Sequence, residues 1–280
     1  MSELAKWYRT FCLYGELAVM TPVMGVGSVL FGTLDRLGLK PEDPHFFGNY
    51  PTYGYCNTNF WAANTTHEFM GKRPEKRSPY IIMANHRSHL DGPAMLLELK
   101  PITFRFLVKQ ELLYVPFMGQ AFWALGFIFV KRGNKESAAQ SAAEVIQRIK
   151  GGENIVVFPE GTRSRTGKML PFKKGGFLMA IEGGVPILPV GIAGSSQMYG
   201  YGFRVRANRG HIVVNCGEPI DTTGYTIDRV DELVRKVRDR IRELELEAHI
   251  AWQSRAREMK LPVPEDIIQR MPGDFAAESA

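Results

Sequence analysis

Cysteine is scarce in this 280-residue chain, which contains only Cys12, Cys56 and Cys216. The wide separation and odd number of these residues give no disulfide framework, and no two of them have the short spacing of a zinc site. We therefore expect a reduced, cytosolic setting. The sequence also lacks internal repeats, low-complexity tracts and long linkers, so its length allows one large domain or two small ones.

Patterns typical of nucleic-acid binding are absent as well. The net charge is +6 and the calculated pI is about 9.2, a balance that favours anionic partners. However, no helix-turn-helix, zinc-finger or aromatic-basic ribonucleoprotein pattern is present. We expect no nucleic-acid partner, because an anionic membrane surface and phosphorylated substrates explain the charge as well.

One long apolar stretch is present, at residues 11–34. It is long enough to cross a bilayer as a single helix, but Pro22 lies near its centre and three glycines follow. We therefore predict two short helices, at about 3–20 and 22–37, that enter one leaflet and return to the cytosolic face. The alternative is a helical pair packed on the protein core.

Alternating apolar strands and helices follow, which predicts an α/β fold with a mostly parallel sheet flanked by helices. The expected domains are a membrane-association hairpin at 1–40, a connecting segment at 41–78 and an α/β domain at 79–280 that includes a C-terminal amphipathic helix. Strands are expected near 79–84, 103–108, 126–131, 154–158, 187–192 and 211–216. Helices are expected near 57–70, 92–99, 116–124, 136–150, 175–183 and 227–259.

A histidine and an aspartate, His86 and Asp91, lie five positions apart directly after the apolar run at 80–84. A helix is predicted to begin at Gly92, so the pair lies in a strand-to-helix turn, where α/β sheets form ligand sites. Histidine titrates near neutral pH and can remove a proton from a hydroxyl group. A carboxylate bonded to the other ring nitrogen would fix its tautomer. The alternative role for Asp91 is helix capping alone.

A second strand, ending near Phe158, is also followed by a polar turn, which contains Gly161, Thr162 and Arg163. Arginine binds phosphate through a planar fork of donors, and glycine allows the backbone to approach a ligand closely. This turn is therefore a candidate phosphate site, and the alternative is a solvated basic loop.

The two turns together resemble a known family. H-x-x-x-x-D followed by F-P-E-G-T-R-S is similar to the glycerolipid acyltransferases, typified by 1-acylglycerol-3-phosphate acyltransferase. Residues 126–132 resemble the second conserved block of that family, and residues 185–190 its fourth. The resemblance covers about residues 78–220 and keeps the order and rough spacing of the blocks.

The resemblance implies transfer of a fatty acyl chain from a thioester donor, either acyl-CoA or an acyl carrier protein, to the free hydroxyl of lysophosphatidic acid. The product is phosphatidic acid. His86 would be the general base and Asp91 would orient it. Neither a metal nor another cofactor is expected, because a thioester is already activated. The residues expected to bind the glycerol phosphate of the acceptor are Arg132, Glu160, Gly161, Thr162, Arg163 and Lys174.

Other functions remain open on this reading. The protein could be a tafazzin-like transacylase that exchanges chains between phospholipids, or it could acylate another lysophospholipid. A non-catalytic lipid-binding protein is a further alternative, since fold does not imply function. A metal site at His86, His89 and Asp91 is a rival interpretation of the first turn. The expected location is the cytosolic face of a bacterial inner membrane or an organelle membrane.

Overall fold

The structure is a computed structural model that describes residues 3–37, 46–75, 79–100, 102–131, 133–164, 168–197 and 209–263. Its centre is a seven-stranded sheet in the order β1-β7-β6-β2-β5-β3-β4. Neighbouring strands are parallel except β6 and β7, which are antiparallel, so the predicted mostly parallel sheet is confirmed. The strands are β1 (Thr65–Gly71), β2 (Ile81–Ala84), β3 (Phe104–Lys109), β4 (Ile128–Val130), β5 (Asn154–Val157), β6 (Ile187–Ala193) and β7 (Gly210–Cys216).

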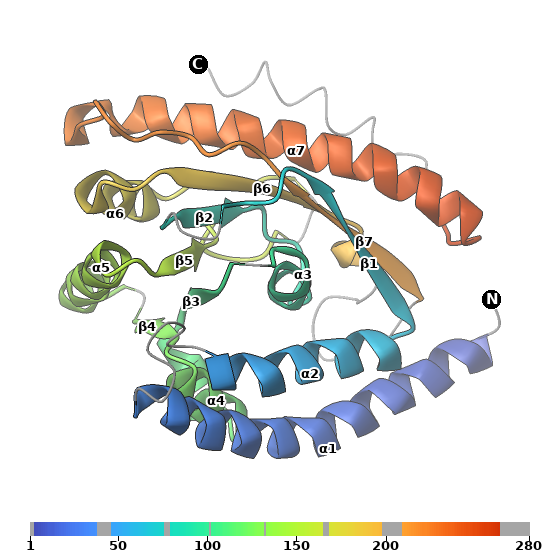
Figure 1. The fold of residues 1–280 in the computed structure, drawn as a ribbon. Coiled ribbons are helices and arrows are strands. Elements are labelled where there is room, and N and C mark those ends of the chain that lie inside the picture. The colour runs from blue at the N-terminus through green and yellow to red at the C-terminus, as the bar shows by residue number, and fades with distance from the viewer. Residues whose placement is uncertain are drawn as a thin grey trace.

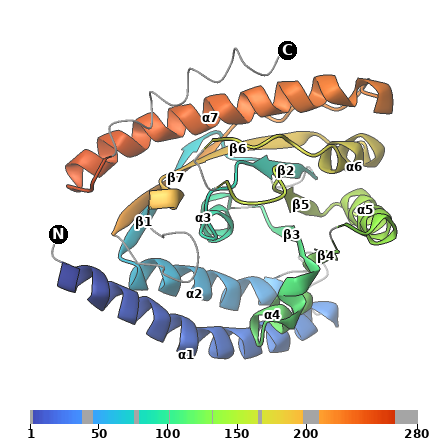
Figure 2. The same ribbon diagram turned by 180° about the vertical axis from the view of Figure 1, so that it is seen from behind.

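Helices cover both faces of the sheet (Figure 1). On one side lie α5, α6 and α7, and on the other lie α2 and α3, with α1 outside α2. Seen from behind, the same layers show α7 and α1 at opposite edges of the molecule (Figure 2). The helices are α1 (Glu3–Arg36), α2 (Phe46–Ala62), α3 (Asp91–Glu98), α4 (Met118–Ala124), α5 (Lys135–Lys150), α6 (Gly175–Gly183) and α7 (Val230–Glu258), and short 3-10 turns form η1 (Gln110–Tyr114), η2 (Ser195–Gln197) and η3 (Ile227–Arg229).

The packing of strand β2 explains why its sequence is uniformly apolar. Successive side chains alternate between the faces of a strand. Ile81 and Met83 pack with α5, α6 and α7, whereas Ile82 and Ala84 pack with α2 and α3. Because helices cover both faces, every residue of β2 is buried, and the polar turn that follows β2 is fixed to the centre of the core.

The C-terminal helix α7 lies directly on β6 and β7. Its apolar stripe, which includes Leu233, Val237 and Ile241, is buried as the helical spacing predicts. At Gly191 of β6, an added Cβ atom would come within 2.3 Å of the α7 backbone. The absence of a side chain there allows the close approach that brings α7 within reach of the turn after β2.

The N-terminal segment differs from the expected hairpin, because α1 is one continuous helix with Pro22 inside it. The glycines that suggested a break instead permit close packing: Cβ atoms at Gly25 and Gly32 would lie 3.0 Å from Phe117 and 2.6 Å from the Ala124 carbonyl. A proline inside a helix costs about 3 kcal/mol. Packing along α2 and α4 offsets this cost, a contribution that a sequence pattern does not reveal.

The partner of α1 is α2, which lies in the expected connecting segment at 41–78. Thr58 donates a hydrogen bond of 2.8 Å to Glu16 of α1, so polar groups join the two helices.

The helix expected at 57–70 is also corrected, since α2 ends at Ala62 and Asn64 adopts a positive φ of 48°. Residues 65–71 then form β1, which pairs with β7 along its full length, so the sheet begins before residue 79.

Candidate active site

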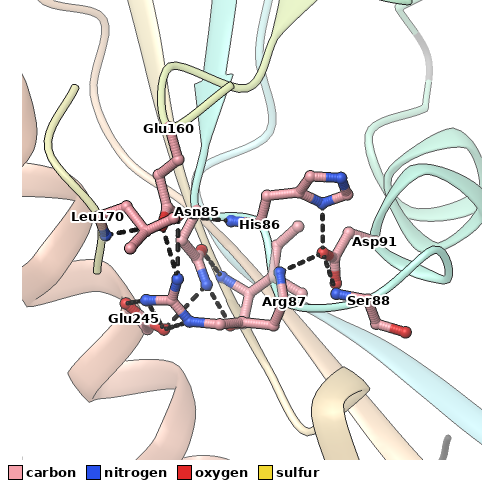
Figure 3. Close-up of polar contacts among 9 residues, drawn as sticks. Asn85, His86, Arg87, Ser88, Asp91, Glu160, Leu170 and Glu245 are labelled. Atoms are coloured by element: carbon pink, nitrogen blue, oxygen red, sulfur yellow. Dashed lines mark hydrogen bonds and ion pairs between the residues drawn. The ribbon is translucent and has the colours of Figure 1, made fainter. Parts of the chain in front are cut away.

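His86 and Asp91 lie together at the carboxyl end of β2 (Figure 3). The Nδ1 atom of His86 is 2.8 Å from Oδ2 of Asp91. Asp91 is completely buried at the first turn of α3, and its Oδ2 atom also accepts hydrogen bonds from the backbone N–H groups of Arg87 and Ser88 at 2.7 and 2.8 Å. Burial tends to raise the pKa of Asp91, but the hydrogen bond and charge of His86 and the Ser88 N–H lower it below its ordinary value. An ionised Asp91 makes Nδ1 the protonated ring nitrogen, so that Nε2 of His86 can accept a proton.

The ring of His86 remains accessible. Its side chain is 20% exposed, and it stacks on Phe158 with ring centroids 4.0 Å apart and an angle of 14°. Phe158 directly follows β5, which pairs with β2, so the two polar turns lie next to each other. The Nε2 side of the ring points away from Asp91 (Figure 3). The geometry therefore suits proton abstraction from a bound hydroxyl group.

A buried cluster of three charged residues lies beside this pair, and we call Arg87, Glu160 and Glu245 the Arg87 cluster. Nη1 of Arg87 is 2.9 Å from Oε1 of Glu160, while Nε and Nη2 donate to the two oxygens of Glu245, each at 3.1 Å. At most 5% of any of the three side chains is exposed. The cluster thus joins the turn after β2, the turn after β5 and helix α7.

Glu160 was expected to contact the acceptor, but the structure places its carboxylate entirely within the protein. Oε1 accepts a hydrogen bond from the backbone N–H of His86 and Oε2 from that of Leu170, both at 2.8 Å. Together with Arg87, these donors occupy both oxygens, and the side chain is 0% exposed. Glu160 therefore fixes the backbone at His86, and in the described part of the chain both of its carboxylate oxygens accept hydrogen bonds from protein donors.

The other expected phosphate ligands have varied surroundings. Gly161 has a φ of +70°, and Thr162 and Arg163 after it are exposed. Lys174 forms an exposed ion pair with Asp231 of α7 at 2.7 Å. Arg132 lies outside the described residues. The turn after β5 thus presents Thr162 and Arg163 to solvent, and the next residue, Ser164, donates its backbone N–H to the carbonyl of His86.

Sequence reasoning missed Arg87, Glu245 and Phe158. Glu245 lies four residues after Ile241 in the apolar stripe of α7, and an acidic residue at a core-facing position of a helix signals a buried partner. Arg87 carried no such signal, because its buried position follows only from the turn. Asn85 also holds this turn, because its side chain bonds both the N–H and the C=O of Ile192 in β6.

The metal interpretation of the first turn finds no support in the described part of the chain. His89 is exposed. Among the residues that the structure describes, no three His, Cys, Asp or Glu side chains are grouped as a metal ion requires. The Nδ1 atom of His86 instead faces the Asp91 carboxylate.

Comparison with known proteins agrees with this geometry. Residues 66–193 match the family model described as Acyltransferase, and this range includes both polar turns. The class of the protein is therefore an α/β acyltransferase. A 1-acyl-sn-glycerol-3-phosphate acyltransferase of Salmonella typhimurium is 36% identical over 238 residues, covering 81% of this chain and 90% of the relative. The protein of the same name from Escherichia coli is 37% identical with the same coverage. The chain belongs to the 1-acyl-sn-glycerol-3-phosphate acyltransferase family, which confirms the resemblance seen in the sequence blocks.

Two further proteins extend the comparison. The yeast 1-acyl-sn-glycerol-3-phosphate acyltransferase is 37% identical over 175 residues, but these cover only 57% of the yeast protein. The crystal structure of the 1-acyl-sn-glycerophosphate acyltransferase from Thermotoga maritima has a TM-score of 0.71 and 26% identity, and covers 95% of this chain and all of that one. The fold similarity therefore extends beyond the matched domain to the N-terminal helices.

Proposed function

We propose that this protein transfers a fatty acyl chain from a thioester donor to the free hydroxyl of lysophosphatidic acid, yielding phosphatidic acid. The observation that carries the proposal is the His86–Asp91 pair, with Nδ1 bonded to a buried carboxylate and the ring accessible on its other side. Relatives named for this activity match across most of the chain.

The reaction follows from the atoms present. Nε2 of His86 removes the proton from the acceptor hydroxyl as its oxygen attacks the thioester carbonyl carbon. Asp91 stabilises the imidazolium that forms. When the tetrahedral intermediate collapses, the carbon–sulfur bond breaks and the thiolate takes the proton from His86. The products are an ester and a thiol, and the histidine is regenerated.

Acceptor recognition follows from the exposed groups of the second turn. Arg163 and Thr162 are exposed in this turn, and we expect their guanidinium and hydroxyl groups to donate hydrogen bonds to the acceptor phosphate. Coenzyme A and acyl carrier protein both carry the acyl group as a thioester at the end of the same kind of chain. The chemistry at His86 is therefore common to both donors.

The test is release of free thiol from oleoyl coenzyme A and from oleoyl acyl carrier protein, each with and without lysophosphatidic acid. We expect release that depends on the acceptor with at least one donor, and its loss in His86→Ala. Acceptor-independent release, or transfer from phosphatidylcholine without any thioester, would contradict the proposal. The second result would favour the transacylase reaction.

We also propose that α1, η1 and α4 form the membrane-facing surface. Helix α1 is long and apolar enough to cross a bilayer by length and composition, and it is near the N-terminus, but this alone is weak support. Stronger support is its location: polar contacts attach α1 to α2, while its outer side is apolar and exposed. The exposed apolar residues of α1 include Tyr8, Phe11, Val19, Val23, Val26 and Leu30.

Residues of η1 and α4 extend this surface. Gly25 and Gly32 bring α1 against Phe117 and Ala124, and the exposed aromatic residues Tyr114, Phe117 and Trp123 lie in this neighbouring segment. Aromatic residues favour the boundary between lipid and water. A helix attached sideways to the protein, with its apolar side outward, suits insertion into one leaflet with the active site on the cytosolic side.

Vesicle binding tests this surface. In the full-length protein, Phe11→Glu with Val19→Glu should weaken co-sedimentation with phosphatidylglycerol and phosphatidylethanolamine vesicles. Ile250→Glu, at an exposed apolar site on α7, is the matched control and should leave binding unchanged. Equal binding by both variants would contradict the assignment. Point substitutions are preferable to deleting α1, because deletion would also uncover its buried contacts with α2 and α4.

A further inference from the structure

Glu245 lies far from the two sequence turns along the chain, yet it is buried against both. Its Oε1 atom accepts hydrogen bonds from Nδ2 of Asn85 at 2.9 Å and from Nε of Arg87 at 3.1 Å, and its Oε2 atom accepts from Nη2 of Arg87 at 3.1 Å. Both residues flank His86 in the sequence. The carboxylate therefore contacts both sequence neighbours of His86, namely Asn85 and Arg87.

Arg87 connects this carboxylate to the backbone of His86 itself. One side of its guanidinium is held by Glu245, and Nη1 donates to both oxygens of Glu160 at 2.9 and 3.0 Å. Glu160 in turn accepts the backbone N–H of His86. A second path runs through Asn85 to β6, because Asn85 bonds both Glu245 and Ile192. His86 is thus fixed from both sides by groups that converge on α7.

The charges argue against stability as the only purpose of Glu245. One guanidinium faces two carboxylates in the Arg87 cluster, and Asp91 adds a third negative charge nearby. Burial raises the pKa of Glu245 to about 7, although the Arg87 guanidinium opposes the increase. Replacing a buried charge network by apolar residues is often neutral or stabilising. Burying these charges costs free energy, and such a network beside a reacting group is typical of a site that requires fixed geometry.

We propose that Glu245 of helix α7 is a positioning residue for the reaction: it holds Arg87 and Asn85, and through them the backbone of His86, so that Nε2 meets the acceptor hydroxyl at the correct angle. The inference rests on the proposed function, in which His86 is the base. It gives α7, which lies outside the matched family range of 66–193, a direct role in the arrangement of the active site.

The test compares Glu245→Gln with Glu243→Gln in the full-length protein. The first keeps the shape and an acceptor oxygen but removes the charge that holds the Arg87 fork. The second removes an equal charge on the same helix, at an exposed residue that pairs with Arg240. We expect Glu245→Gln to lower kcat by about 10- to 100-fold with the KM of both substrates within about threefold, since small displacements of reacting groups reduce rates this much. Glu243→Gln should match the wild type.

Chemical modification of His86 gives a readout that does not depend on turnover. Diethyl pyrocarbonate modifies accessible histidine rings, and the rate at His86 can be followed by mass spectrometry of its peptide. We expect a changed rate at His86 in Glu245→Gln and the wild-type rate in Glu243→Gln. A wild-type protein without acyl transfer would refute the proposed function, whereas the modification rates would still decide the role of Glu245.

Arg87→Lys tests the same contacts from the other side, because it keeps the positive charge but loses the planar fork. We expect a reduced kcat in this variant too. Unchanged kcat and unchanged His86 modification in folded Glu245→Gln would overturn the proposal. It would also be overturned if both variants failed to fold, or if activity fell only in proportion to the folded fraction measured by urea unfolding, because Glu245 would then serve stability alone.

Discussion

The turn after β2 and the turn after β5 lie at the ends of two paired strands, yet the structure holds them in different ways. In the first turn, His86, Arg87 and Asp91 are all fixed by hydrogen bonds to buried protein groups. In the second turn Glu160 is buried, while Thr162 and Arg163 are exposed. A general base must keep one orientation, whereas a phosphate can be met by a long side chain that adjusts to it. The comparison separates a rigid turn, which holds the proposed base, from an adaptable turn, which holds the proposed phosphate ligands.

The largest expected effect comes from removing the base in the rigid turn. His86→Ala should lower kcat by about 100- to 10,000-fold, the usual loss for a general base. Asp91→Asn should also reduce kcat severely, because an amide cannot stabilise the imidazolium as a carboxylate does. Steady-state thiol release measures both, and circular dichroism checks that the variants are folded. Near-wild-type turnover in either variant would assign proton transfer to another group.

Arg163→Ala tests the adaptable turn. We expect the KM for lysophosphatidic acid to rise by about 10- to 100-fold, the equivalent of one charge-assisted hydrogen bond of about 1.5–3 kcal/mol. The KM for the thioester donor and the unfolding midpoint should change little, since the side chain is exposed. A larger rise in the donor KM would place the acceptor phosphate elsewhere.

Glu160→Ala distinguishes the two parts of the second turn. It leaves the backbone N–H groups of His86 and Leu170 and one side of Arg87 without their acceptor, so it should destabilise the fold by about 2–4 kcal/mol. Below the unfolding temperature, it should reduce kcat more than it raises the acceptor KM. Urea unfolding and steady-state kinetics provide the two measurements. The opposite kinetic pattern would return Glu160 to direct contact with the acceptor.

The smallest effect concerns the pH dependence of stability. Glu245 has an ordinary pKa of 4.5 and a folded pKa of about 7, so the folded protein binds more protons than the unfolded chain between these values. Its contribution to the free energy of unfolding is therefore fully present below about pH 4.5 and is lost as the pH rises through about 7. Relative to the wild type, Glu245→Gln should lose less stability between pH 5 and pH 8. Urea midpoints at four pH values test this difference, with Glu243→Gln as the control; parallel curves for wild type and Glu245→Gln would rule it out.

The N-terminal region shows where prediction from sequence failed. Pro22 and three glycines suggested a break, and the expected connecting segment at 41–78 was assigned no helix before residue 57. In the structure, proline lies inside both α1 and α2, and glycine lets α1 pack against α4. Strand β1 was missed for a similar reason, because its partner β7 lies about 145 residues further along the chain. Local propensity is a weak guide where packing between distant segments supplies the energy.

The sequence alone determined the alternating strands and helices of residues 79–260, the class of fold and the location of the candidate site, because apolar periodicity and short motifs are local properties. It also predicted that His86 and Asp91 lie together, since five residues in one tight turn suffice to bring them together. Only the tertiary structure decided that Glu160 is buried, that Arg87 links two turns, and that Glu245 completes the cluster. Those contacts join residues 73 to 158 positions apart, and their energies depend on removing charges from water, which occurs only when the whole chain is folded.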